Sequence, residues 1–457
     1  MMKKARRRPA RQRWPRIKFS ISRPWIGSGH WRRPIDLLRR FAQRLPWRKP
    51  RHTAEEENVW QLYNEVIWWG VMNGVAGTFL GVFAIRLGAS AQLMGLLTAL
   101  PALVTSIWSI PASRIVESQR HRIPILVSAA ALQRGGYLLI ALMPFATFLR
   151  QADTLVLLAS LVTLPTVLFN VAFTSLLADV VPPNERARVI SIRSLLLTIV
   201  SMATTLLGGW VLDRILFPYN YQLLFIVAAT ASLMGLPHLR RLQVAEAKPL
   251  DSGPPPARFR DRWRNTIQSL SKQGNFWRFA VGTFTFYWGL YLPIPLYNLY
   301  RVRELDISDA WIGLFSVAFN LSSLLPYVFW GRQAGKRGNR WVLLASTAGM
   351  SLYPTLTGFS SRVEPLLLVS IWGGLFGPGF NISLFNALLE NTPADHRPSY
   401  VGIHTTLINV ASFLAPLLGS ALSEMWGVRT ILIASGGVRL LGVLAMLVLV
   451  PRSPETN

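Results

Sequence analysis

Charged residues inside long apolar stretches are the part of this sequence best suited to chemistry. Glu65 lies in the run that begins near residue 60, and Arg134 lies in the middle of a later run. A charge is costly to place in hydrocarbon, so such residues are candidates for binding or proton transfer. Glu65 is the carboxylate placed inside a run away from its ends, where desolvation alters its protonation. We therefore predict that Glu65 couples proton movement to function. Arg134 is a second candidate, with a structural ion pair as its alternative.

Aromatic and amide side chains form a second set of candidates. The run 277–300 is rich in Phe, Tyr and Trp, and Phe169-Asn170 recurs as Phe380-Asn381 after 211 positions. Aromatic walls with a few amides suit an amphipathic or apolar small molecule better than a multiply charged anion. Aromatic residues near the end of a span alternatively mark the membrane interface. The predicted binding residues of this set are Asn73, Asn170, Tyr287, Tyr291 and Asn381.

These candidates lie on stretches long enough to cross a membrane. The chain has 457 residues, of which 51% are hydrophobic and 15% charged, whereas soluble proteins carry about 25% charged residues. Apolar runs of about 18 residues or more are typical of membrane-spanning helices and exceed what a soluble helical core needs. We predict twelve spans, near residues 60–85, 91–112, 123–147, 154–178, 189–212, 221–239, 277–300, 309–330, 341–360, 366–389, 400–423 and 428–450.

Two internal matches indicate that the chain is built from two related halves. Ser90–Arg122 aligns without a gap with Ser308–Arg340, 218 positions later, and both segments join an apolar span to a basic turn. A second match, offset by 211 positions, pairs Asp179 with Glu390 and Arg186 with Arg397. Repeated supersecondary units of this kind are typical of duplicated membrane proteins. The sequence therefore predicts two six-helix bundles of all-α structure.

The distribution of basic residues predicts the orientation. The net charge is +27, and Lys and Arg concentrate in alternate short loops, as expected for cytoplasmic loops. Both termini are then cytoplasmic, in a multi-pass protein of the cell membrane. Residues 1–58 form a basic tail that either binds anionic lipids or only sets the topology; we expect no nucleic-acid partner. Predicted domains are the tail (1–58), a first bundle (59–243), a linker with an interfacial helix (244–275), a second bundle (276–451) and a short tail (452–457).

Several classes of function are excluded by what the sequence lacks. The chain has no cysteine, so disulfides, zinc–thiolate sites and thiol nucleophiles are absent. It has no Gly-x-x-x-x-Gly-Lys-Ser/Thr loop, which argues against ATP hydrolysis by this chain. Scattered acids and histidines do not form the clusters that a membrane-embedded transferase needs. We therefore expect no catalytic residues, no metal site and no cofactor.

The basic turns resemble a signature of the major facilitator superfamily, Gly-x-x-x-Asp-Arg-x-Gly-Arg-Arg between the second and third spans. In the second half the matching positions are Gly331, Lys336, Gly338 and Arg340, and Gly335 replaces the aspartate. In the first half they are Ser113, Glu117 and Arg122. The resemblance covers about residues 60–450 and implies twelve spans in two bundles that rock about a central site.

The resemblance also implies a gate and a function. An acid at the cytoplasmic end of the second span can pair with a basic residue nearby, so Glu117 is expected to pair with Arg186 or Arg188 when the outer side is open. The chain is then a secondary active transporter of a small molecule, expected to be a monomer. Half of an antiport-associated glycine motif, at Gly208-Gly209, favours export. A receptor or assembly factor of the same fold is the alternative, and a membrane transferase is a further one.

Overall fold

The computed structural model describes residues 53–119, 121–145, 150–243, 274–392 and 397–450. Within these ranges the chain is helical and contains no β-strand. The described residues belong to one unit, Arg51–Asn457. Most of the predicted basic tail, nearly all of the linker and the short final tail lie outside them, as do the lipid contacts predicted for the tail.

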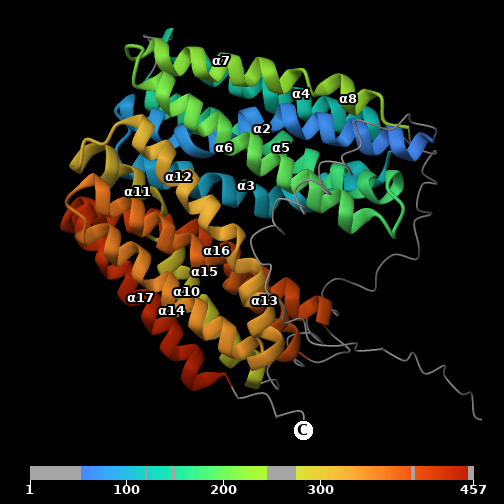
Figure 1. Ribbon diagram of the computed structural model, residues 1–457. Coiled ribbons are helices and arrows are strands. Elements are labelled where there is room, and N and C mark those ends of the chain that lie inside the picture. The colour runs from blue at the N-terminus through green and yellow to red at the C-terminus, as the bar shows by residue number, and fades with distance from the viewer. Residues whose placement is uncertain (1–52, 120, 146–149, 244–273, 393–396, 451–457) are drawn as a thin grey trace, which may run out of the picture. The chain divides into compact units, whose positions relative to one another are not determined.

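The first half contains the helices that correspond to spans one to six (Figure 1). A 3₁₀ turn, η2 (Met143–Phe145), follows α4. The first helix starts four residues before the predicted end of the tail, because Thr53 caps it and accepts a hydrogen bond from Glu56 N at 3.2 Å. The helices are α2 (Ala54–Arg86), α3 (Ala91–Glu117), α4 (Arg122–Ala141), α5 (Gln151–Val180), α6 (Arg186–Leu212), α7 (Tyr219–Leu233) and α8 (Leu236–Arg240).

The second half repeats this order, with two of its spans broken. Each of the twelve predicted spans coincides with one helix or one broken helix of the described chain, and ten candidate spans meet the length and hydropathy expected of a membrane helix. The helices are α10 (Gly274–Tyr291) with α11 (Ile294–Leu299) and the π-helix η3 (Tyr300–Glu304), α12 (Asp309–Leu324) with α13 (Pro326–Arg337), α14 (Asn339–Phe359), α15 (Val363–Glu390), α16 (Arg397–Trp426) and α17 (Val428–Leu449).

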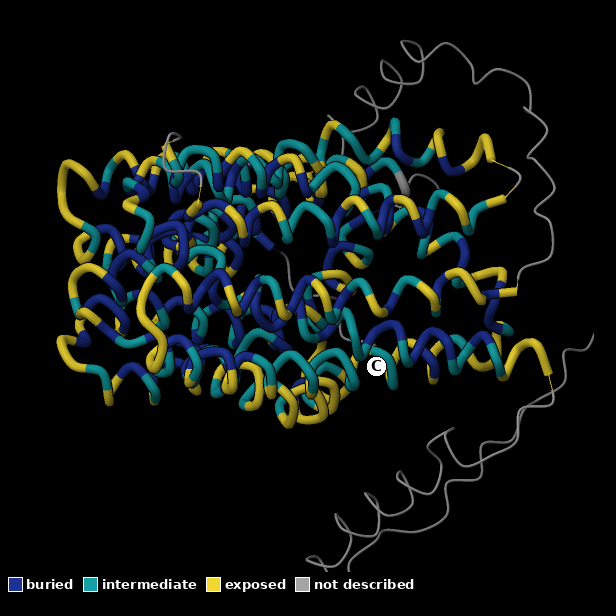
Figure 2. Tube along the Cα trace, turned by 90° about the horizontal axis from the view of Figure 1, so that it is seen from above, coloured by how far each residue is buried: buried dark blue, intermediate teal, exposed yellow. Residues whose placement is uncertain are grey.

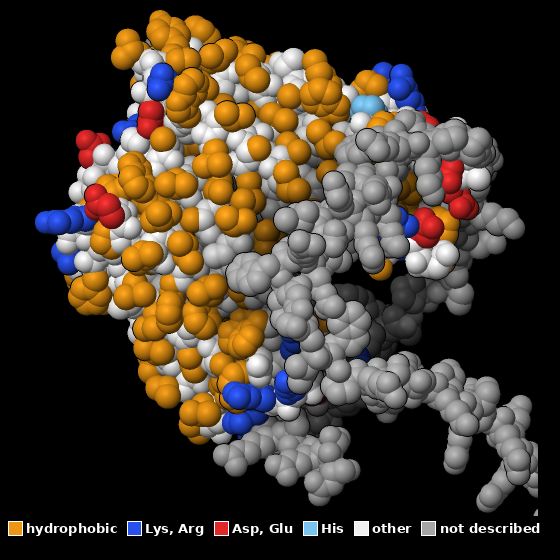
Figure 3. Space-filling view, in the orientation of Figure 1, with side chains coloured by type: hydrophobic (Ala, Val, Ile, Leu, Met, Phe, Trp, Pro, Cys, Tyr) orange, Lys and Arg blue, Asp and Glu red, His pale blue; other side chains and the backbone are white. Residues whose placement is uncertain are grey.

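The outer surface of the helices is apolar. Many large hydrophobic side chains are exposed, including Ile107 at 65%, Leu207 at 66% and Leu325 at 85%. Figure 3 shows hydrophobic side chains across the face in view, with charged ones toward its edges. Soluble proteins rarely expose apolar patches of this extent, whereas a lipid environment favours them. The prediction of an all-α integral membrane fold is confirmed.

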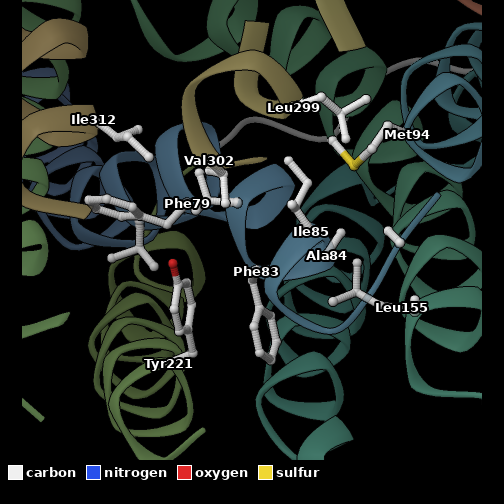
Figure 4. Close-up of a cluster of buried hydrophobic side chains, with 14 of the residues drawn as sticks. Phe79, Phe83, Ala84, Ile85, Met94, Leu155, Tyr221, Leu299, Val302 and Ile312 are labelled. Carbon is white, nitrogen blue, oxygen red and sulfur yellow. The ribbon is translucent and has the colours of Figure 1, made fainter. Parts of the chain in front are cut away.

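Buried apolar side chains form three clusters. One contains residues of both halves, among them Phe79, Phe83, Tyr221, Leu299 and Ile312 (Figure 4). The other two belong to one half each: the first-half cluster is built around Leu62 and Leu176, and the second-half cluster around Phe276 and Leu388. Figure 2 shows buried stretches of the helices on the sides that face other helices. The halves therefore share apolar packing at one end of the helices and pack separately at the other.

We name the two ends by residues. At the Arg86 end, α2 finishes and residues 87–90, 213–218 and 305–308 connect helices. At the Arg122 end, α4 begins and residues 181–185 and Gly338 lie between helices. Gly338 has φ of +80°, a left-handed conformation that favours glycine and lets the chain turn directly from α13 into α14. The shared apolar cluster lies toward the Arg86 end.

Arg439 compensates for two prolines in the second half. Its Nε donates to the carbonyl of Gly289 at 2.8 Å, and its Nη1 donates to that of Met350 at 2.7 Å. The residues four positions later, Pro293 and Pro354, have no backbone N–H and cannot complete the helical hydrogen bonds to these carbonyls. Arg439 is 3% exposed, and its guanidinium therefore replaces the two missing donors in a buried place.

This arrangement predicts a specific stability effect. Arg439→Met should lower the melting temperature of the purified protein, because each buried carbonyl left without a donor costs about 1–3 kcal/mol. Pro354→Ala should recover part of the loss in the Arg439→Met background, because alanine supplies a backbone N–H to Met350. An unchanged melting temperature in Arg439→Met would contradict this role.

Candidate functional site

Two adjoining cavities lie between the halves and share Gly77, Thr78, Ser316 and Asn320 in their walls. The Arg301 cavity, about 280 Å³, is lined by α2, α11, η3, α12 and α14. The Asn73 cavity, about 210 Å³, is lined by α2, α6 and α12. Sites between two repeats near the middle of the helices are typical of membrane transport proteins. These cavities are therefore the candidate site.

Hydroxyl groups from three helices meet at the junction of the cavities. Thr78 Oγ1 lies 3.2 Å from Ser316 Oγ and 3.3 Å from Thr205 Oγ1. Asn73 Nδ2 donates to Ser201 Oγ at 3.1 Å. The first of these bonds joins the two halves, and the others join α2 to α6 within the first half. The junction thus presents exchangeable hydroxyl and amide groups rather than charges.

Close backbone contacts make this junction possible. A Cβ on Gly74 would lie 2.5 Å from the carbonyl oxygen of Ser201, so only glycine lets α2 and α6 approach this closely. Across the halves, a Cβ on Gly209 would lie 2.9 Å from both Ala310 Cα and the Asp309 carbonyl oxygen. Glycines at such contacts allow membrane helices to pack backbone to backbone.

Arg301 is a cavity residue that lies just beyond the end of the predicted span 277–300. Its Nη2 lies 3.0 Å from the Tyr353 hydroxyl, and its guanidinium carbon lies 5.4 Å from the centre of the Phe315 ring. The π-helix η3 carries the span beyond its expected end and turns Arg301 toward the cavity. The spacing of Tyr297, Tyr300 and Arg301 with Glu304 is helical and could have indicated this extension.

Glu65 forms a buried ion-pair network with two arginines. Its Oε1 lies 2.6 Å from Arg134 Nη2, and its Oε2 lies 2.9 Å from Arg193 Nη2. The side chains of Glu65 and Arg134 are each 1% exposed, and that of Arg193 is 18% exposed. Arg134 also lies over the Trp69 ring and Arg193 over the Phe173 ring. The network links α2, α4 and α6 and carries one more positive than negative charge.

The remaining predicted binding residues lie in different places. Asn73 lines its cavity, whereas Asn170 and Asn381 are exposed and line neither cavity. Tyr287 is buried and stacks on Tyr291, with ring centres 5.7 Å apart. Glu65 and Arg134 lie in their network rather than in the walls of either cavity. The coupling role of Glu65 stays a prediction.

The residues of the predicted gate lie at the Arg122 end but are not paired as expected. Glu117 is exposed at the end of α3 and forms no ion pair with any described residue. Arg186 donates instead to the carbonyls of Val181 and Ala178, at 2.9 and 2.6 Å, and so caps α5. The Glu117–Arg186 pair was predicted for a state with the outer side open, and it stays a prediction.

Other signature residues hold helix ends within one half. Arg122 pairs with Asp179 at 2.7 Å, and Asn339 donates to Glu390 at 2.7 Å. The 211-residue offset of the repeat relates Asp179 to Glu390. Arg340 donates to the carbonyls of Val450 and Leu447, and Ser113 donates to that of Ile110. Gly331 and Lys336 lie on α13, before Gly338.

Polar contacts join the halves at the Arg86 end. The Asp213 carboxylate accepts backbone N–H bonds from Asp309 at 2.9 Å and from Ala310 at 3.3 Å. These two N–H groups belong to the first turn of α12, where unpaired donors and the helix dipole favour a negative charge. Arg86 adds an ion pair to the Asp309 side chain at 3.5 Å. This contact fixes the end of α6 to the start of α12.

The repeat places a related contact on the other side of the interface. Gln92 Nε2, in the first turn of α3, donates to Glu424 Oε2 at 2.7 Å. Glu424 follows Asp213 by the 211-residue offset, and Ala310 follows Gln92 by the 218-residue offset. We name these contacts, made by Arg86, Gln92, Asp213, Asp309 and Glu424, the Arg86-end latch.

Comparison with protein families assigns the chain. The family model described as Major Facilitator Superfamily matches residues 68–300 and residues 279–457. The chain belongs to the Major Facilitator Superfamily. The predicted family and the predicted two-bundle fold are thereby confirmed. This is a superfamily of multi-pass membrane transporters and not of enzymes.

Curated relatives match a part of the chain. Multidrug resistance protein MdtG of Klebsiella pneumoniae (strain 342) is 33% identical over 154 residues, which are 32% of this chain and 36% of that protein. MdtG of Proteus mirabilis (strain HI4320) is 29% identical over 182 residues, 37% of this chain and 44% of that protein. The matches thus span less than half the length of these relatives.

Solved structures match over most of the chain. The nucleoside transporter NupG is 13% identical, with a TM-score of 0.62 over 88% of this chain and 100% of that chain. A bacterial homologue of the human lysosomal transporter Spinster, in an inward-facing and unoccupied conformation, is 13% identical, with a TM-score of 0.58 over 87% of this chain and 97% of that chain. At these identities the likeness concerns the fold.

Proposed function

We propose that this member of the Major Facilitator Superfamily is a secondary active transporter that exports a small amphipathic or apolar molecule by alternating access. The observation that carries the proposal is the uneven packing of the halves. They share one apolar cluster and the Arg86-end latch at one end, and they pack separately at the other. Two bodies joined at one end around central cavities have the geometry of one state of such a cycle.

The charge distribution supports an orientation for this state. Basic residues of the loops concentrate at the Arg122 end, which is then the cytoplasmic side, with both termini. In the second half, α13 packs on α14 and α15 of its own half, whereas α12 packs on α6 across the interface. We infer that the cavities open toward the cytoplasm in this structure and that the Arg86-end latch closes the outer side. Cargo would then enter the cavities from the cytoplasm or from the inner leaflet.

Export is supported by two further observations. The matched relatives are named multidrug resistance proteins, and Gly209 of the paired glycines makes a close contact with α12, which would seal the outer side in the orientation inferred above. Coupling to protons through Glu65 would work by releasing Arg193, the more exposed arginine of the network, when the carboxylate becomes neutral. We expect a monomer to suffice, because both cavities are built within one chain.

Flux measurements in proteoliposomes test this proposal. Protein reconstituted in one orientation should accelerate the movement of a fluorescent amphipathic substrate, and an imposed proton gradient should drive accumulation. Empty liposomes give the baseline for passive leak. Saturable binding of compounds without any flux would contradict transport and favour a receptor or assembly role for the same fold.

A further inference from the structure

Arg301 is the arginine that lines the candidate site, and no ion pair with a described acid balances its charge. Arg86, Arg122, Arg134 and Arg193 each form an ion pair with an acid. Arg301 forms none with any described residue, and its one hydrogen-bond partner there is the neutral hydroxyl of Tyr353. Its charge is therefore open to a partner from outside the chain.

The side chain is fixed in place. The guanidinium carbon lies over the rings of Phe315 at 5.4 Å and Tyr297 at 5.9 Å, and these contacts restrict its position. Arg439 in turn donates to the Tyr297 hydroxyl at 3.2 Å. The Nε of Arg301 is buried and has no acceptor among the described residues. A positioned guanidinium with a free donor is suited to binding an anionic group with two oxygens.

The cavity around Arg301 combines this cation with an apolar wall. Ile312, Phe315 and Phe319 supply apolar and aromatic surface, while Asn320 and Ser316 supply polar groups. Among the described residues that line the two adjoining cavities, none is Asp or Glu. A cationic ligand would therefore meet an uncompensated positive charge and find no counter-charge there.

We propose that the cargo of this transporter is an amphipathic organic anion, whose carboxylate or sulfonate group binds Arg301 and whose apolar part packs on Phe315 and Phe319. The inference rests on the proposed transport function and narrows its substrate class. It also revises the expectation drawn from the aromatic spans, because a single negative charge is now required. An organic cation of the same size is a poor ligand.

Three ligands with one tail test the inference. Full-length protein in nanodiscs of neutral lipid is titrated with octanesulfonate, octyltrimethylammonium and octyl glucoside, and binding is followed by calorimetry. Octanesulfonate should bind most tightly. Arg301→Gln should weaken it about tenfold to a hundredfold, since a hydrogen bond to a charged group contributes about 1.5–3 kcal/mol, and should leave octyl glucoside unchanged. Arg301→Lys should retain part of the affinity.

Matched controls separate this effect from a general loss of charge or fold. Arg362, an exposed arginine before α15, should be replaceable by glutamine without effect on octanesulfonate. Melting temperatures of both variants show whether they fold. Equal affinity for the cation, or unchanged octanesulfonate binding in folded Arg301→Gln, would overturn the inference.

Two further experiments distinguish a lipid anion from a soluble one and test the proposed transport function separately from the anion site. If phosphatidylglycerol nanodiscs abolish octanesulfonate binding in the unaltered protein at a salt concentration that screens the charge of the bilayer, the anion that Arg301 takes is a lipid head group, and the inference of a soluble cargo is overturned. If octanesulfonate binds through Arg301 but no octanesulfonate crosses proteoliposomes, the transport proposal fails while the anion site stands.

Discussion

Replacing Glu65 with glutamine is expected to destabilise the protein by about 3–5 kcal/mol, seen as a marked fall in melting temperature and in the yield of folded protein. The carboxylate is the common partner of Arg134 and Arg193, and its own side chain is 1% exposed. Without it, two guanidinium groups remain close together in a buried site. Breaking a buried ion pair by removing one member costs about this much, because the other charge is left uncompensated.

A double-mutant cycle distinguishes this account from simple loss of packing. Arg134→Met alone should also destabilise, whereas Glu65→Met with Arg134→Met removes the buried pair together and should cost less than the sum of the single changes. Glu117→Gln is the matched control, because Glu117 is an exposed acid on the neighbouring helix α3. Additive losses in the cycle would show that the charges act independently, contrary to the network.

The same variants test the coupling prediction. If protonation of Glu65 drives the cycle, the compensated double variant should fold yet lose the dependence of flux on the proton gradient. If the network is structural alone, that variant should keep both flux and its pH dependence. The melting temperature and the pH profile therefore report on two different roles of one carboxylate.

The spans and the repeat could be predicted because both are written in local sequence. Apolar length defines a membrane helix without knowledge of its neighbours, and the 218-residue offset pairs Gly95 with Gly313. In the structure both glycines lie at contacts between the halves: a Cβ on Gly95 would lie 3.1 Å from the Pro416 carbonyl oxygen, and one on Gly313 would lie 3.0 Å from that of Thr205. The repeat therefore pairs two glycines that lie at the interface between the halves, which the alignment alone does not show.

Pairings between helices could not be predicted, because they depend on how the helices face one another. Arg193 looked like an ordinary residue near the start of a span, yet it reaches Glu65 across 128 positions. Arg186 is predicted to pair with Glu117 in another state, and in this structure it donates to carbonyls at the end of α5, which the sequence does not show. Arg439 lies within a span, and prolines on two other helices determine its partners.

One signal in the sequence was available and unused. Asp213 and Glu424 lie at equivalent positions of the repeat, Asp213 directly after α6 and Glu424 in the last turn of α16. Loop acids usually serve solubility or topology, so their equivalence did not distinguish them. The structure shows that each meets the first turn of a helix from the other half. Equivalent charged residues in both halves therefore indicate contacts between the halves, as equivalent glycines do.

Gly209→Ala is expected to shift the protein strongly toward the state in which the Arg86 end is open. The added Cβ would lie 2.9 Å from Ala310 Cα and from the Asp309 carbonyl oxygen, both backbone atoms at the start of α12. Neither is the end of a flexible side chain, so α6 and α12 must separate. Overpacking costs about 1–3 kcal/mol, which corresponds to a roughly 5- to 150-fold change in the ratio of the two states.

Spin-label distances measure this shift, and the absence of native cysteines means that no background labelling needs to be removed first. Cysteines placed at Leu87 and Asp306 report on the Arg86 end, and their separation should increase in Gly209→Ala. Gly135→Ala is the matched control, because a Cβ there meets nothing within 4 Å, and it should leave the distances unchanged. Asp213→Asn should act in the same direction but less, since it keeps the side-chain oxygen and loses only the charge at the helix terminus, about 0.3–1 kcal/mol. An unchanged distance in Gly209→Ala would mean that α6 and α12 do not separate in the cycle, and the closed side would then have to be assigned to other contacts.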